Sequence, residues 1–108
     1  MTDQLPELDP VIHAQARLRV VAALSTLADG DKLSFPRLQE ILAMTAGNLS
    51  VHLRKLEDAG YVAMDKRFVD RKPQTSYALT ERGRTALLDY VAHLERLLPP
   101  KSSERKVR

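Results

Sequence analysis

A change of hydrophobic period in the middle of the chain constrains the fold more than any other feature of this sequence. Over residues 45–60 the apolar side chains recur at helical spacing, and three leucines fall within a narrow arc of that helix, at Leu49, Leu53 and Leu56. Over residues 61–68 apolar and polar residues alternate instead, which is the period of a strand. The sequence therefore predicts a helix that is followed at once by a strand.

The predicted helix has a start signal and a stop signal, and the strand after it opens a hairpin. Thr45 is placed to cap the helix with its hydroxyl group, and Gly60 is typical of the left-handed residue that ends a helix. Residues 70–73, with the sequence DRKP, are typical of a turn, and residues 75–79 favour a second strand. The hairpin therefore has a basic tip. The apolar residues of its first strand are Val62, Met64 and Phe68.

Other helices are predicted on both sides of this unit. Asp9-Pro10 is typical of a helix start, Ser34 is expected to cap another helix, and Thr80 is expected to cap a third. The sequence DGD and a Pro-Pro pair are typical helix ends. The expected helices cover residues 11–28, 35–42 and 81–98, with a very short strand at residues 32–33.

The order of these elements predicts one fold class. Helix, helix, helix, hairpin, helix, with a tight turn between the second and third helices, is a mainly α chain with a small β-hairpin, a winged helix-turn-helix. It has a three-helix core, a wing and a long C-terminal helix. We expect a flexible arm at residues 1–8, one domain at residues 9–98, and a basic disordered tail at residues 99–108.

Composition excludes several classes of protein. The 108 residues suit one domain, and the absence of cysteine excludes disulfides, thiolate metal sites and cysteine nucleophiles. The longest apolar run, residues 20–24, is too short to cross a membrane, and the acidic N-terminus lacks an apolar signal core. We therefore expect a cytoplasmic protein without a membrane partner.

The net charge of +3 is distributed unevenly. The last eight residues account for an excess of three positive charges, so residues 1–100 are neutral. Within that part, residues 1–44 hold four basic and six acidic residues, whereas residues 45–79 hold six basic and four acidic residues. The positive excess lies in the predicted helix and hairpin, where it favours a nucleic-acid partner.

The side of the predicted helix without leucines suits a DNA major groove. Its first turn is small, so the backbone can approach bases; Asn48 can read adenine, Arg54 guanine or phosphate, and Val51 a thymine methyl group. A solvent-exposed helix face is the alternative for each residue alone, but the cap, the leucines, the glycine and the basic hairpin occur together. The expected DNA contacts are Thr45, Gly47, Asn48, Ser50, Val51, His52, Arg54 and Lys55.

The hairpin carries the second group of expected DNA contacts. Basic side chains on a wing can follow phosphates or enter a minor groove. The alternative is a charged edge that prevents strand aggregation. These residues are Lys66, Arg67, Arg71 and Lys72, with Asp70 among them.

Three segments resemble small winged-helix transcriptional regulators related to the MarR and ArsR families: ARLRVVAAL, LSVHLRKLEDAGYV and FVDRKPQTSYALTERGR. The resemblance covers about residues 9–98, and its DNA-binding residues carry over to residues 45–55 and 66–75. It implies a repressor-like regulator of bacteria or archaea that binds double-stranded operator DNA as a homodimer. The chain lacks the cysteines of ArsR-type metal sensors and is shorter than MarR-type proteins, so the resemblance does not identify a small-molecule effector.

The last predicted helix independently suggests a dimer. It has more apolar surface than a small three-helix core needs, and the first helix shares this excess. Packing across a twofold axis would bury that surface, whereas the alternative is that the helix folds back over its own domain. The expected interface residues are Ile12, Val20, Leu87, Tyr90, Val91, Leu94, Leu97 and Leu98.

Enzyme and metal sites are not predicted. His13, His52 and His93 lie on three different predicted helices without paired-ligand spacing, although His13 and His93 could meet at a dimer interface. The four glycines form no phosphate-binding loop, and no nucleophile motif or catalytic carboxylate pair is present. We therefore predict no cofactor, no metal and no catalysis. A winged-helix module that binds a partner protein instead of DNA is the alternative function.

Overall fold

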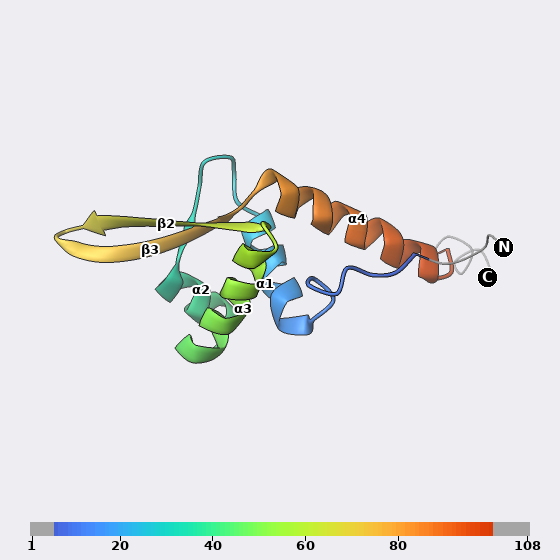
Figure 1. The fold of residues 1–108 in the computed structure, drawn as a ribbon, viewed down its shortest axis with the longest axis horizontal. Helices are drawn as coiled ribbons and strands as arrows, with labels where there is room; N and C mark the ends of the chain where they lie inside the picture. The colour runs from blue at the N-terminus through green and yellow to red at the C-terminus, as the bar shows by residue number, and fades with distance from the viewer. Residues whose placement is uncertain (1–5, 101–108) are drawn as a thin grey trace, which may run out of the picture.

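The computed structural model describes residues 6–100, and Figure 1 shows an elongated molecule with three parts. Three short helices form the central body, a long hairpin projects from one side, and the last helix projects from the other. This arrangement agrees with the predicted element order. The helices are α1 (Gln15–Ser25), α2 (Phe35–Leu42), α3 (Ala46–Asp58) and α4 (Glu81–Leu97), and the strands are β1 (Leu33–Ser34), β2 (Val62–Val69) and β3 (Lys72–Leu79).

Helix α1 is shorter than predicted at both ends. Asp9 does cap backbone N–H groups, since its Oδ1 accepts from the Val11 amide at 2.8 Å, but it caps an isolated turn over residues 10–13. The helix begins only after Ala14, which provides no side-chain cap. The prediction of one helix over residues 11–28 was therefore wrong, because the Asp-Pro signal starts a separate turn.

That turn is held against the rest of the chain by polar contacts. The Tyr61 hydroxyl donates to Asp9 Oδ2 at 2.5 Å, and this hydrogen bond is the main cause of a raised Tyr61 pKa. The Arg17 Nε atom donates to the Val11 carbonyl at 2.7 Å. Of the expected N-terminal arm, residues 6–8 are described, while residues 1–5 and the tail residues 101–108 lie outside the described part of the chain.

The start and stop signals around α2 and α3 are confirmed. Ser34 accepts from the Arg37 amide at 3.2 Å, and Thr45 accepts from the Asn48 amide at 3.2 Å. The turn between the helices passes through Ala43 in the left-handed region, with φ 54°. Gly60 has φ +81°, so a left-handed residue ends the α3 segment as predicted. These local signals fix the angle at which α3 leaves the body.

The sheet has three antiparallel strands in the order β1-β3-β2. Strand β1 confirms the short strand expected near residue 33, and it pairs with the body end of β3. Val69 pairs with Lys72, so the hairpin turn consists of Asp70 and Arg71 alone. The predicted four-residue turn was too long, because both central residues adopt positive φ (53° and 68°) and close the hairpin tightly.

The core lies where α1, α2, α3 and the body end of the wing meet. It is aliphatic, as expected from a chain without Trp. Leucines on the buried face of α3 join residues of α1 and α2, and Tyr77 closes the core from β3. Its fully buried side chains are Ile12, Val20, Val21, Leu24, Leu38, Leu49, Leu53 and Leu56.

Candidate nucleic-acid interface

The outer face of α3 is open to solvent. Leu49, Leu53 and Leu56 anchor the helix in the core, which leaves the opposite side uncovered. Val51, near the centre of that side, is 53% exposed. We call this surface the α3 outer face. Its exposed residues are Thr45, Ala46, Gly47, Asn48, Ser50, Val51, Arg54 and Lys55.

A groove runs along one edge of this face, between α3 and the hairpin. We call the hairpin of residues 62–79 the wing. The groove has a volume of about 630 Å³ and is lined by Ser50 of α3, the start of α2 and the wing residues Lys66 and Lys72. Two of the predicted wing contacts therefore face the same space as one of the predicted α3 contacts.

A second groove runs along the opposite edge of α3. We call it the α1–α3 groove; its volume is about 430 Å³. Sequence reasoning missed the part that α1 plays here, because only the packing of α1 on α3 brings the two helices together. Its lining residues are Gln15, Ala16, Arg19, Met44, Asn48 and His52.

His52 differs from the other predicted contacts on α3, since it is half-buried at the edge of the helix. Nη1 of Arg17 lies 3.3 Å from its Nδ1 atom. Burial, followed by the positive charges of Arg17 and Lys55, lowers the pKa of His52 below its usual 6.5. The ring is therefore neutral at physiological pH.

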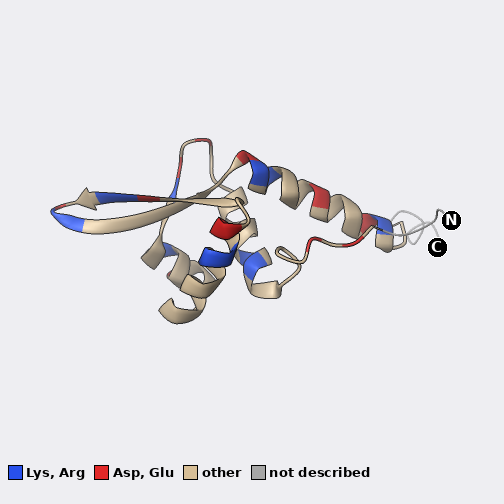
Figure 2. Cartoon of the chain, in the orientation of Figure 1, with Lys and Arg blue, Asp and Glu red and all other residues tan. Residues whose placement is uncertain are grey.

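The wing carries its basic residues towards its tip. Figure 2 shows the basic segments along β2 and at the turn, with further basic segments in α3 and α1 of the body. Lys66, Arg71 and Lys72 are exposed. Arg67 is different, because it forms an ion pair with Asp65 at 2.7 Å, and that interaction lowers the pKa of Asp65. Arg67 is thus less available to DNA than the other three.

Apolar residues of the wing are also exposed. Phe68 is 75% exposed, and Met64 and Val69 are exposed as well. The alternation of β2 predicted the strand correctly, but only Val62 reaches the core. The reason is that most of the wing extends beyond the body, so it has no core to cover (Figure 1).

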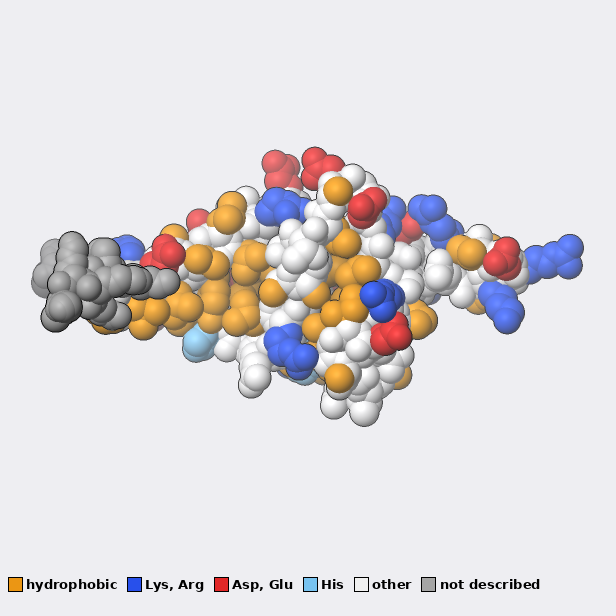
Figure 3. Space-filling model, turned by 180° about the vertical axis from the view of Figure 1, so that it is seen from behind, with side chains coloured by type: hydrophobic (Ala, Val, Ile, Leu, Met, Phe, Trp, Pro, Cys, Tyr) orange, Lys and Arg blue, Asp and Glu red, His pale blue; other side chains and the backbone are white. Residues whose placement is uncertain are grey.

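Helix α4 presents a band of hydrophobic side chains, seen along the helix in Figure 3. Leu88 is 65% exposed and was not among the predicted interface residues, although it lies on the same side as Val91. We call the stripe Leu87, Leu88, Val91, Leu94 and Leu98 the α4 stripe. Leu97 is exposed beside it.

Three residues of the predicted dimer interface are not on this stripe. Ile12 and Val20 are 0% exposed inside the core of their own subunit, and Tyr90 is 5% exposed. The Tyr90 hydroxyl lies 2.9 Å from Nδ1 of His13, so it joins α4 to the N-terminal turn. These three assignments are corrected, because the side chains are already buried by the chain itself.

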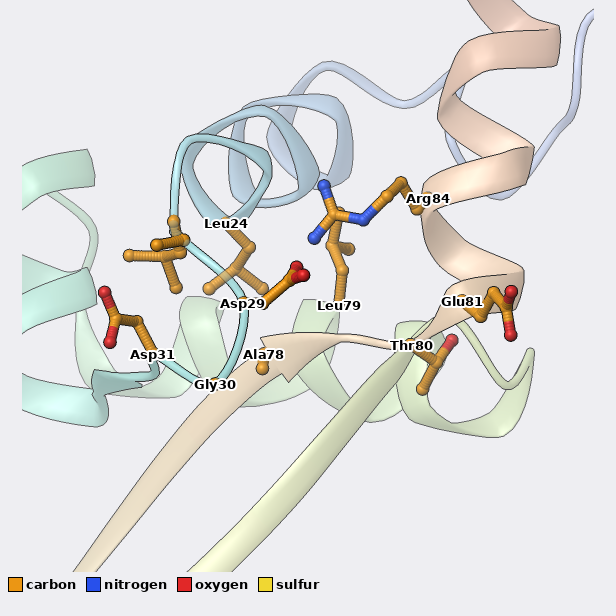
Figure 4. A pocket seen from close by; sticks show the side chains of 11 residues that line it. Leu24, Asp29, Gly30, Asp31, Ala78, Leu79, Thr80, Glu81 and Arg84 are labelled. Atoms are coloured by element: carbon orange, nitrogen blue, oxygen red, sulfur yellow. The ribbon is translucent and has the colours of Figure 1, made fainter.

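Other cavities have a lining of different charge. The one in Figure 4, about 370 Å³, lies between the end of α1 and the start of α4, and Arg84 extends from α4 towards the loop that bears Asp29. Asp31 and Glu81 also line it. Three carboxylates around one guanidinium make this cavity a poor site for a phosphate.

Metal ligands and membrane segments were searched for over residues 6–100. No group of three or more His, Asp or Glu side chains in that part of the chain has the geometry to hold a metal ion. None of its helices combines the length and apolarity needed to span a bilayer.

Comparison with known proteins agrees with this geometry. A family model described as a winged helix DNA-binding domain matches residues 17–98. An uncharacterised protein of Methanocaldococcus jannaschii is 31% identical over 87 residues, which cover 81% of this chain and 91% of that protein. A transcriptional regulator homologue from Pyrococcus horikoshii has a similar structure, with a TM-score of 0.72, 29% identity, and coverage of 81% of this chain and 83% of that chain.

More distant structures share the fold. Bacillus subtilis PadR, solved in complex with operator DNA, gives a TM-score of 0.60 at 17% identity and covers 71% of this chain and 47% of that chain. Regulators of the MarR and ArsR families match at 22% identity, with TM-scores of 0.60 and 0.51. The winged-helix resemblance seen in the sequence is confirmed. The chain belongs to the winged helix DNA-binding domain family.

Proposed function

We propose that the chain is a transcriptional regulator that binds double-stranded operator DNA in a sequence-specific manner, as a homodimeric repressor. In this proposal α3 enters the major groove, and the wing lies on the adjacent backbone or in the minor groove. The observation that carries it is the α3 outer face, which is exposed along its whole length while its leucines are buried. A helix in this situation has the dimensions that a major groove accepts.

The chemistry of the α3 outer face supports base reading. Gly47 and Ser50 are small, so the first turns can approach base edges closely. Asn48 can form two hydrogen bonds with adenine, and Arg54 can do the same with guanine. Val51 has no polar group and suits the methyl group of thymine. Lys55 lies further along the helix and suits a phosphate.

A dimer is part of the proposal because the α4 stripe is otherwise exposed to water. Leu87, Val91, Leu94 and Leu98 are spaced by four, three and four residues, which is the heptad spacing of two helices packed side by side. Pairing along this seam would bury the stripe. It would also allow two recognition helices to lie about 34 Å apart, one turn of DNA.

The relatives support the same function. The similar Pyrococcus horikoshii protein is described as a transcriptional regulator homologue, and Bacillus subtilis PadR was solved with operator DNA. The second likeness concerns the fold alone. The residues that would read DNA in this chain are therefore argued from its own surface.

The test is a selection of bound sequences from a random duplex library, followed by affinity measurements on the selected duplex. We expect Asn48→Ala and Arg54→Ala each to weaken binding by about 1–3 kcal/mol, or roughly 5- to 150-fold, and to relax the preference at one base position. Arg82→Ala removes a charge from α4 and serves as the control. A reporter gene placed downstream of the selected sequence tests repression. If neither α3 variant changes the affinity or the preference, the base-reading assignment is wrong.

A protein-interaction module is the second candidate, and the exposed apolar wing favours it. Phe68, Met64 and Val69 present more hydrophobic surface than a purely phosphate-binding wing requires. If the selection yields no enriched sequence and the wild-type chain shows no salt-dependent DNA binding, this second function is favoured over the first.

A further inference from the structure

We propose that the α1–α3 groove holds the second sugar-phosphate strand of the major groove, so that α1 as well as the wing anchors the DNA. The inference rests on the proposed DNA-binding function and adds a contact surface to it. Its residues are Gln15 and Arg19 of α1, with Asn48 and His52 of α3. The partner chemistry is a phosphodiester backbone.

The two grooves lie on opposite edges of one helix. Ser50 borders the wing groove, whereas Asn48 and His52 border the α1–α3 groove. At 3.6 residues per turn, both side chains project roughly 160 degrees from Ser50 around the helix axis. The α3 outer face lies between them. A helix in a major groove has the same surroundings, because one phosphate strand runs along each flank.

The lining of the α1–α3 groove suits an anion. Among its six lining residues there is no carboxylate, whereas a guanidinium, two amides and an imidazole are present. Other cavities of the described chain differ in this respect. The cavity of Figure 4 contains three carboxylates. Another, between the N-terminal turn and α4, is lined by Glu7, Asp9 and Asp89. A phosphate is therefore attracted to the α1–α3 groove and repelled from those two.

Arg19 is held in place and still has donors to offer. Its Nη2 atom donates to the Leu42 carbonyl at 2.9 Å, at the end of α2. A guanidinium has five N–H groups, so this bond leaves most of them for another acceptor. The bond also fixes the plane of the side chain, which reduces the entropy lost when a phosphate is bound.

His52 presents a donor rather than a lone pair. Arginine has no acceptor atom, so the 3.3 Å contact between Arg17 Nη1 and His52 Nδ1 makes Nδ1 the acceptor. The proton of the neutral ring is then on Nε2, where it can be donated to a phosphate oxygen. Arg17 therefore acts as a positioning residue, since it selects the tautomer of His52.

The first experiment measures the salt dependence of binding to the duplex obtained in the selection. Arg19→Gln removes one cation and keeps an amide that can donate to Leu42. We expect its slope of log binding constant against log salt to be shallower by about 0.9, the value for one phosphate contact. Arg82→Gln makes the same charge change on α4 and should leave the slope unchanged. Thermal unfolding of both variants shows whether the loss of the Leu42 contact has disturbed the fold.

The second experiment locates the DNA strand directly. Because the chain contains no cysteine, Gln15→Cys and Lys66→Cys each provide one attachment point for an iron chelate that cleaves nearby DNA backbone. We expect the two conjugates to cleave opposite flanks of the same major groove. Both sites are exposed, so neither substitution should disturb the core.

The outcomes separate this inference from the proposed function. If the wild-type chain binds no DNA, both fail. If it binds, and Arg54→Ala weakens binding while Arg19→Gln keeps the wild-type slope and the Gln15→Cys conjugate does not cleave, the α1–α3 groove is not a strand site although the function stands.

Discussion

Arg17 of α1 lies against His52 of α3, with Nη1 and Nδ1 3.3 Å apart. The same guanidinium donates through Nε to the Val11 carbonyl at 2.7 Å, so one side chain joins the N-terminal turn, α1 and the candidate recognition helix. This contact requires an unprotonated Nδ1, and it accounts in part for the lowered pKa of His52. It therefore gives both the stability and the DNA binding of the protein a dependence on pH.

Stability should decrease as the pH falls below about 6.5. The folded-state pKa of His52 is lowered by burial, Arg17 and Lys55, so the unfolded chain takes up the proton more readily than the folded chain. Above pH 6.5 both states are neutral at this residue and its effect vanishes. His52→Gln should flatten this part of the curve in urea unfolding measured at a series of pH values. An equal slope in the variant would show that other groups cause the dependence.

DNA affinity should change in the opposite direction. A phosphate beside His52 favours the protonated ring, so binding takes up a proton and strengthens as the pH falls through the pKa. We expect a gain of up to about tenfold for each unit by which the bound DNA raises that pKa. Fluorescence anisotropy at constant ionic strength measures it. The gain should be absent in His52→Gln, and a wild-type affinity that is constant with pH would contradict the contact.

Gly83 is required where α4 meets β2. A Cβ atom at this position would lie 2.1 Å from the Tyr61 carbonyl oxygen, which is backbone and cannot rotate away. That carbonyl also accepts from the Thr80 amide at 3.0 Å. We therefore expect Gly83→Ala to lower the free energy of unfolding by about 3 kcal/mol and Tm by more than about 10 °C.

Gly47 provides the matched control for this prediction. A Cβ atom there would have no neighbour within 4 Å, so Gly47→Ala should keep or slightly raise the stability. Circular dichroism melts of the two variants make the comparison. Equal Tm values would mean that α4 does not approach β2 as closely as described.

The sequence was sufficient for the elements whose signals are local. The caps at Ser34 and Thr45 and the left-handed Gly60 were correctly predicted, because each depends on a residue and its immediate neighbours. The start of α1 was not, since Asp9 makes a cap wherever a turn follows and the sequence does not show how far that turn continues.

Surfaces made by packing were harder to predict. The α1–α3 groove depends on Arg19 lying beside α3, and Arg19 belongs to the part of the chain with an acidic charge balance. Its sequence neighbours gave no sign of that position. The burial of Ile12 and Val20 likewise follows from packing, because an apolar helix face looks the same in sequence whether its own core or a second subunit covers it.

The turn of the wing should show a trade between stability and DNA binding. Arg71 has φ 68°, a conformation that costs a residue with a Cβ atom roughly 1–2 kcal/mol and costs glycine nothing. Arg71→Gly should therefore raise the free energy of unfolding by about 1 kcal/mol. Because it also removes a cation from the tip, the salt slope of DNA binding should become shallower by about 0.9.

Lys72→Gln is the control for this turn, since it removes a charge at the neighbouring strand position without changing a strained backbone. It should reduce the salt slope and leave the stability unchanged. Urea unfolding and anisotropy titrations distinguish the two effects. Arg71→Gly binding with an unchanged slope would exclude the tip from contact with phosphate.

The α4 stripe should hold two copies together, and one charge placed on its seam tests this. Val91→Glu would bury a carboxylate between the helices without a partner, which strongly opposes association. We expect light scattering to give twice the chain mass for the wild type and the chain mass for the variant. Thr85→Glu makes the same charge change on another side of α4 and should remain dimeric. On a duplex with two half-sites, Val91→Glu should bind at least about 100-fold more weakly, because the second half-site is no longer linked to the first. A dimeric Val91→Glu would place the subunit contact elsewhere.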